Sequence, residues 1–176
     1  MAYQPTFNPQ EIKLFNTYPG LRGAVTGRIH WANLATVQKF GTTNGKNPRA
    51  YHTCVYAAFI AEEKGEYITR QYIRAHNSSS NIDPTVRTSN LHNGEIGISI
   101  GANVNRFGKS HGKSGSAKTN TPVQSGSNSF VASNDSSSNQ GDAEVEMAIR
   151  KLGEFISISE ECYRAFKKGQ LKTDGY

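Results

Sequence analysis

Apolar and polar positions alternate along several stretches of the first two-thirds of the chain. The alternation is clearest in residues 95–104, where every second position is apolar: Ile96, Ile98, Ile100, Ala102 and Val104. Residues 22–31 and 51–60 follow the same period of two, and both faces of 51–60 are fairly apolar. A period of two is typical of a β-strand, and apolar residues on both faces indicate a central strand.

Two further segments are less decisive. Residues 66–75 are rich in Tyr, Ile and Thr and predict a third strand, with a helix as the competing interpretation. Residues 86–91 predict a weak strand, and the Asn93-Gly94 pair that follows favours a tight hairpin turn. The sequence therefore predicts a mainly β fold, an OB-like barrel or sandwich of four or five short strands within about residues 20–108.

Two features frame the predicted sheet. Residues 10–18 lie between prolines and predict a short helix before the first strand. Gly97 and Gly101 lie on the polar face of the last predicted strand, where small residues indicate the close approach of another backbone or of a ligand.

The composition changes near residue 114. Residues 114–141 are rich in Ser, Asn and Gly and predict a flexible linker. The Phe130-Val131 pair within them is interpreted as incidental rather than as a docking motif. From residue 142 the apolar positions recur at helical spacing, which predicts an amphipathic helix, or a helix pair if Gly153 interrupts it. The predicted organisation is a basic domain over 1–113, a linker over 114–141 and a helical segment over 142–176.

The charge is divided in the same way. The chain carries a formal net charge of +6, and residues 1–118 hold 14 Lys and Arg against 6 Asp and Glu. That part of the chain also carries 12 of the 17 aromatic residues. Aromatic and cationic groups on one sheet face suit a single-stranded nucleic acid, because bases stack on rings while cations follow the phosphates.

The candidate nucleic-acid contacts are therefore rings and cations of the predicted sheet, together with two basic loops at 41–50 and 105–118. Arg28 and His30 share the polar face of the first predicted strand, and Arg70 shares a face with Tyr72 in the third. The full set is Arg28, His30, Trp31, Lys46, Arg49, Tyr56, Arg70, Tyr72, Arg74, Arg106, Phe107, Lys109 and Lys113. The competing interpretation is a solvated basic surface around a core that uses about half of the rings.

The candidate motifs for catalysis or metal binding each lack a required residue or spacing. The two Gly-Lys-Ser tripeptides, at 108–110 and 112–114, have no glycine five residues before them, where a phosphate-binding loop needs one. The five histidines show no spacing typical of a metal site. His52 and Cys54 imitate a base and a nucleophile, but no third group is evident to orient them. The sequence predicts no enzyme, no cofactor and no metal.

Cysteine usage and hydropathy suggest a compartment. Cys54 and Cys162 are far apart in sequence and surrounded by apolar residues, which favours two buried thiols over a disulfide or a metal pair. No apolar run approaches the length of a membrane span, and residues 1–6 lack the pattern of a secretory signal. These patterns predict a cytoplasmic protein that does not enter a membrane.

Two functional hypotheses follow. The first is a non-enzymatic protein that binds single-stranded DNA or RNA largely without sequence preference. The alternative is a structural or interaction subunit of a viral or cellular assembly, which self-associates through the β-domain and the C-terminal helix. Residues 142–168 are the expected contact for a second copy or for another protein partner.

Overall fold

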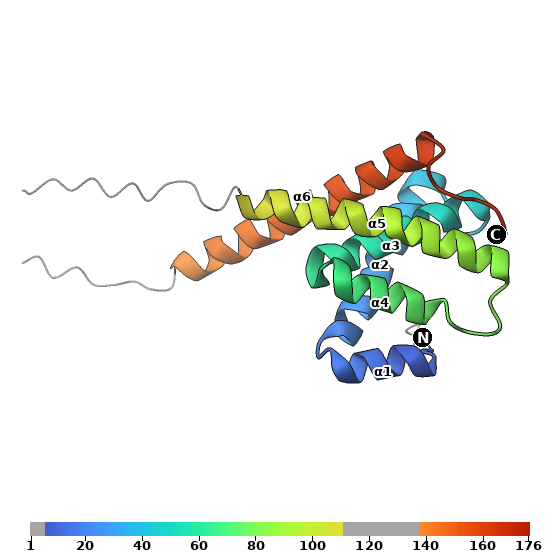
Figure 1. Ribbon diagram of the computed structural model, residues 1–176. Helices are drawn as coiled ribbons and strands as arrows, with labels where there is room; N and C mark the ends of the chain where they lie inside the picture. The colour runs from blue at the N-terminus through green and yellow to red at the C-terminus, as the bar shows by residue number, and fades with distance from the viewer. Residues whose placement is uncertain (1–5, 111–137) are drawn as a thin grey trace, which may run out of the picture.

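The computed structural model describes residues 6–110 and 138–176, and both parts are helical (Figure 1). The helices are α1 (Pro9–Thr17), α2 (Leu21–Phe40), α3 (Lys46–Lys64), α4 (Glu66–His76), α5 (Pro84–Ser110) and α6 (Ser138–Lys167). The described residues contain no β-strand. The prediction of a mainly β, OB-like barrel or sandwich is therefore wrong.

Helix α3 is the centre of the fold. It packs against α2, α4, α5 and α6, and every residue from Cys54 to Ala61 is buried. Such a helix is apolar all round because it has neighbours on all sides. The apolar residues on both faces of 51–60 correctly indicated a central element, but the element is a helix.

Helix α2 shows why the alternation was misleading. Its buried residues follow the i, i+3, i+4 spacing of a helix face and are mostly small: Leu21, Ala24, Val25, Ala32, Ala35 and Thr36. Alanine contributes little to a hydropathy pattern, so the helical face is hard to see in the sequence. Of the larger residues that suggested alternation, Ile29 is only partly buried and Trp31 is exposed.

Close packing of α5 on α3 depends on two glycines. A Cβ atom at Gly97 would lie 2.1 Å from the carbonyl oxygen of Cys54, and one at Gly101 would lie 2.1 Å from the carbonyl oxygen of Ala58. Only a residue without a side chain allows the two backbones to approach so closely. The close approach expected from these glycines is confirmed, but it joins two helices rather than a strand and its neighbour.

The chain after α6 turns back along α5. The buried side chain of Asn93 accepts a hydrogen bond from the backbone N–H of Lys172 and donates one to its carbonyl, both at 2.8 Å. Ser89 donates to the carbonyl oxygen of Asp174 at 2.8 Å. Asn93 therefore binds the C-terminal segment to α5. Because Asn93 and Gly94 lie within this continuous helix, the predicted hairpin at Asn93-Gly94 is wrong.

The two halves of helix α6 differ: its C-terminal half, which we call the base of α6, is partly buried, and its N-terminal half projects from the bundle. Ile158, Cys162 and Ala165 are buried against the bundle, whereas residues 143–153 are all exposed. Figure 1 shows the start of α6 and the end of α5 extending together beyond the other helices. The prediction of a helical C-terminal segment is confirmed, and the helix continues through Gly153 without a break.

The remaining predicted segments are partly confirmed and partly outside the described residues. The short helix expected over 10–18 is confirmed as α1, and 66–75 adopts the competing helical form as α4. Residues 114–137 of the expected linker, with Phe130-Val131, lie outside the described residues, whereas 138–141 already belong to α6. Neither described range holds a helix that is both long and apolar enough to cross a bilayer.

Candidate interaction surface and polar cavity

Four aliphatic residues form an exposed stripe along the first half of α6. Val145, Ile149, Leu152 and Ile156 are each more than half exposed. Their spacing of four, three and four residues is that of the a and d positions of a coiled coil. We call these four residues the α6 seam. A soluble surface rarely keeps so many large aliphatic side chains in one line unless another surface covers them.

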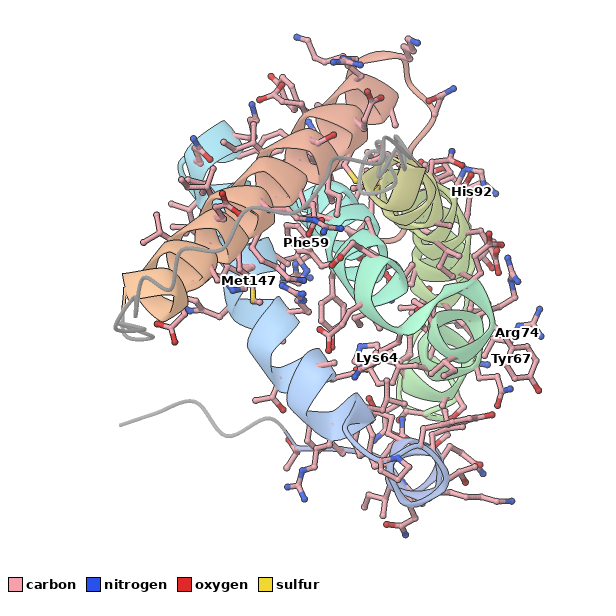
Figure 2. The ribbon with its side chains drawn as sticks, turned by 90° about the vertical axis from the view of Figure 1, so that its left-hand side faces the viewer. Phe59, Lys64, Tyr67, Arg74, His92 and Met147 are labelled. Atoms are coloured by element: carbon pink, nitrogen blue, oxygen red, sulfur yellow. The ribbon has the colours of Figure 1, made fainter. Side chains whose placement is uncertain are left out.

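The four seam residues lie on one side of α6, and one apolar residue of similar exposure lies on the opposite side. Met147 is as exposed as Ile149, at 64% against 65%. At 3.6 residues per turn, Met147 lies roughly 200° around the helix from Val145, and so on the opposite side. Figure 2 looks onto the projecting end of the molecule, with Met147 labelled on α6 beside α2.

Helix α2 extends the apolar surface next to α6. Trp31 is 40% exposed and its ring packs edge-on against Phe155 with 5.1 Å between the centroids. A groove of about 460 Å³ lies between the two helices, lined by Arg28, Trp31, Ala148, Lys151, Leu152 and Phe155. Leu152 belongs to both the seam and the groove, so an apolar side chain from a partner that covers the seam has a place to insert.

Polar contacts fix the base of α6 on the bundle. The Tyr51 hydroxyl lies 2.8 Å from the Ser159 hydroxyl and donates to the Ser159 carbonyl at 3.1 Å. Lys39 of α2 pairs with Glu160 in the same part of α6. Nearer the start of the helix, Lys151 Nζ lies 3.6 Å from a carboxylate oxygen of Glu62. The seam therefore lies on a helix whose C-terminal half is fixed to the bundle.

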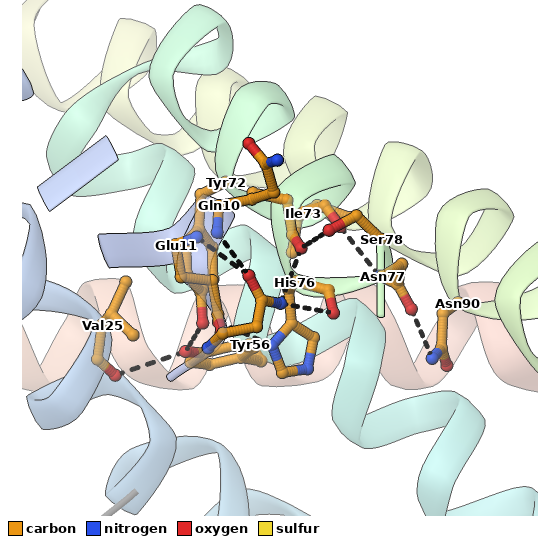
Figure 3. A network of polar contacts seen from close by, with 12 residues as sticks. Gln10, Glu11, Val25, Tyr56, Tyr72, Ile73, His76, Asn77, Ser78 and Asn90 are labelled. Carbon is orange, nitrogen blue, oxygen red and sulfur yellow. Dashed lines mark hydrogen bonds and ion pairs between the residues drawn. The ribbon is translucent and has the colours of Figure 1, made fainter. Parts of the chain in front are cut away.

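A cavity of about 130 Å³ lies on another side of the bundle, between α1, α2, α3 and α4. Its apolar wall includes Phe7, Val25 and Ile73. A polar network runs along it, in which the hydroxyls of Tyr56 and Tyr72 lie 2.9 Å apart (Figure 3). The cavity thus combines apolar walls with a few polar groups, the usual composition of a small-molecule pocket.

Glu11 is the charged member of this network. Its carboxylate accepts hydrogen bonds from the backbone N–H of Asn8 at 2.7 Å and lies 2.9 Å from Nδ1 of His76. Burial by itself would raise the pKa of Glu11, but the hydrogen bonds from His76 and Asn8 outweigh it and hold the pKa below its usual value. Through its contact with His76 the carboxylate joins α1 to α4.

His52 is the polar group of the cavity that lacks a partner. Its Nε2 atom is shielded from solvent and has no hydrogen-bond partner among the described residues. Burial, with a smaller contribution from the charge of His76, lowers the pKa of His52 to about 4. The ring is therefore neutral at pH 7. In a helix, His52 and Cys54 point to different sides, so they do not form the base and nucleophile considered from the sequence.

Several of the predicted nucleic-acid contacts are buried or already paired in this fold. Tyr56 and Tyr72 are buried, at 6% and 1% exposure, and so are not available to stack on bases in this fold. Arg28 forms ion pairs with Glu62 and Glu63. Arg70 pairs with Glu95 across α4 and α5. Trp31 is exposed, but it lies on the apolar surface beside α6.

The remaining predicted contacts are spread over several helices. His30, Lys46, Arg49 and Arg74 are exposed and come from α2, α3 and α4. Arg106, Phe107 and Lys109 fall in the last turns of α5, where only the backbone is described, and Lys113 lies outside the described residues. The single-strand hypothesis keeps its cations but loses the sheet that was to align them.

Sequence reasoning missed the Glu11–His76 pair. One signal was present: Asn8 and Glu11 are spaced as a capping box, in which the two residues bond each other's backbone N–H groups at the start of α1. That spacing identifies Glu11 as a helix-start residue, but nothing in the sequence places His76 beside it.

Comparison of the chain with protein-family models, curated proteins and solved structures found no match. Functional inference for this chain therefore rests on its own geometry.

Proposed function

We propose that the protein is a helical interaction protein that self-associates through the α6 seam. The observation that carries this proposal is the line of four aliphatic side chains, each more than half exposed, on a helix whose base is fixed in the bundle. Fully burying a large aliphatic side chain contributes about 1.5–3 kcal/mol, so covering a side chain that is half exposed contributes about half of that. The alternative considered from the sequence was self-association through a β-domain and the C-terminal helix. The described residues contain no β-domain, so the proposal keeps only the C-terminal helix and assigns it a defined surface.

A second copy of this chain is the occupant that the seam fits best. The spacing of four, three and four residues is the same in both directions along the helix. In an antiparallel pair, Val145 of one copy therefore meets Ile156 of the other while Ile149 meets Leu152, and all four residues of each copy are used. A two-fold axis then relates the two identical patches.

Electrostatics and the adjoining groove support the same arrangement. Antiparallel helices place the positive start of one helix dipole next to the negative end of the other. The groove between α2 and α6 gives the second copy a concave apolar surface beside the seam, with Trp31 in its wall. Exposed tryptophan in a groove is typical of the residues that dominate binding energy at interfaces.

Sedimentation velocity on the full chain tests the proposal with a matched pair of variants. Ile149→Asp places a charge in the seam and is expected to raise the dimer dissociation constant at least ~100-fold, because two charges enter one apolar interface. Met147→Asp changes an equally exposed residue of the same helix on the opposite side. It is expected to leave the dissociation constant within about threefold of the unmodified chain.

The outcomes are distinct. Equal effects of the two variants, or a chain that stays monomeric, would contradict self-association through the seam. A monomer that associates only with added single-stranded DNA or RNA would instead favour the nucleic-acid hypothesis. Binding of that kind weakens steeply with salt because counterions are released from the phosphates. It also depends on exposed cations such as Lys46 and Arg49 rather than on the seam.

A further inference from the structure

The two cysteines of the chain meet in the core. Cys54 of α3 and Cys162 of α6 are both fully buried, as expected from the sequence, and neither takes part in a disulfide. Their Sγ atoms lie 3.1 Å apart although the residues are 108 positions apart in the chain. A disulfide has an S–S length near 2.05 Å, so the two sulfurs are about 1 Å from bonding distance.

The surroundings hold the two sulfurs in this relation. Tyr51 precedes Cys54 by about one turn of α3, and Ser159 precedes Cys162 by about one turn of α6; their side chains are hydrogen-bonded. The Tyr51 ring also packs against Tyr163, with 6.1 Å between centroids. The backbones on either side of the thiols are thus fixed by neighbouring contacts, which leave a gap of about 1 Å between the sulfurs and bonding distance.

We propose that Cys54 and Cys162 form a reversible intramolecular disulfide that locks the base of α6 to α3. A small disulfide such as oxidised glutathione serves as the oxidant. One cysteine thiolate attacks it, forms a mixed disulfide and releases one glutathione thiol. The second cysteine then displaces the other glutathione. Two protein thiols become one disulfide, and one oxidised glutathione becomes two reduced molecules.

Burial determines how the reaction proceeds. Neither sulfur is accessible in the closed bundle, and burial raises the pKa of the Cys162 thiol well above its ordinary value. Exchange therefore takes place when the base of α6 opens locally or before the helix has docked. Once formed in the closed core, the bond is protected from reductants in the same way. The seam in the first half of α6 is unaffected, so the disulfide sets the anchorage of the helix rather than its partner surface.

Mass spectrometry and thermal unfolding of the full chain in glutathione buffers test the proposal. In the oxidising buffer the intact mass is expected to fall by two hydrogens, and no thiol is left to react with an alkylating agent after denaturation. A bridge across 108 residues restricts the unfolded chain, and we expect the melting temperature to rise by ~10 °C relative to the reduced chain.

Cys54→Ala and Cys162→Ala are the controls, each compared with itself in the two buffers. Neither single variant can form the bridge, so each should melt at the same temperature whether oxidising or reducing glutathione is present. This comparison remains valid even where the substitution itself lowers stability. Three results would overturn the proposal: two reactive thiols retained after refolding in oxidising buffer, a disulfide between chains, or an oxidised chain that melts no higher than the reduced one.

Discussion

Helix α3 and the first half of α6 are both rich in apolar residues, and they differ in what covers them. Every residue of α3 from Cys54 to Ala61 is buried among four neighbouring helices, whereas residues 143–153 of α6 are all exposed. The side chains of α3 thus have their partners within the chain. The side chains of the α6 seam are not buried by any of the described residues. In the proposed dimer, a second copy would cover them.

The contrast also separates two kinds of apolar pattern. The core around α3 uses many small residues, Ala and Gly, which let helices approach closely. The seam has large aliphatic residues at coiled-coil spacing, whose side chains can pack between those of a partner helix. Substitutions in the two regions should therefore fail in different ways: unfolding in the first and loss of association in the second.

The largest effect on stability is expected at the contact between α3 and α5. Gly97→Ala would place a Cβ atom 2.1 Å from the Cys54 carbonyl oxygen, a backbone atom that cannot rotate away. We expect a loss of about 3 kcal/mol or more in the free energy of unfolding, measured by urea denaturation.

Gly153→Ala is the matched control in α6, since nothing lies within 4 Å of a Cβ atom there. It should stabilise the chain by up to ~1 kcal/mol, because alanine favours a helix over glycine. Similar losses from both glycine substitutions would show that the contrast between the two helices is wrong.

A pH dependence is expected inside the bundle. Because the pKa of His52 falls from its ordinary 6.5 to about 4 on folding, the unfolded chain binds more protons between these values. Stability is then fully present above about pH 6.5 and is lost as the pH falls towards 4, by up to ~3 kcal/mol.

Denaturation of the unmodified chain and of His52→Asn across this pH range isolates the effect. Glu11, whose pKa is lowered, adds its own loss at more acidic pH in both proteins, so only the difference between them reports His52. Parallel curves for the two proteins would contradict the burial of the neutral ring.

A smaller effect is expected where α3 meets the base of α6. Tyr51→Phe removes the hydroxyl that bonds the hydroxyl and carbonyl of Ser159. The free energy of unfolding should fall by about 1–2 kcal/mol, because Ser159 remains buried with one partner fewer. Sedimentation of this variant at a temperature well below its transition should show unchanged self-association, since the seam is intact.

The smallest effect is expected at the exposed pair between α4 and α5. Arg70→Ala removes the ion pair with Glu95, whose side chains are 36% and 48% exposed. Surface pairs of this kind contribute little, so the change in unfolding free energy should stay below about 0.5 kcal/mol in a denaturation experiment. A loss above 2 kcal/mol would mean that the pair is part of the core rather than of the surface.

The sequence predicted the parts of the fold that large residues define. The helix over 10–18 and the C-terminal helix carry large apolar residues at helical spacing, and both are present. The two buried thiols were also predicted correctly. The seam residues themselves were visible in the pattern, but their exposure was not, because a helix face looks the same whether its cover belongs to the same chain or to another.

The rest was hidden by small residues. In α2 the buried face is carried largely by alanines, and in α5 by glycines that touch a neighbouring backbone. Neither residue type marks a helix face in a hydropathy pattern, while the β-branched residues between them suggested strands. The cavity was missed for a different reason: Glu11, His52 and His76 come from three helices, and their meeting depends on tertiary packing.

The central claim is that the α6 seam pairs with a second copy of this chain. Sedimentation equilibrium of the unmodified full chain, from low to high micromolar concentration, tests it most directly. We expect a single reversible transition from the 19.3 kDa monomer to a species of twice that mass, with no larger assemblies, because an antiparallel pair is closed. A chain that keeps the monomer mass at every concentration would contradict the account.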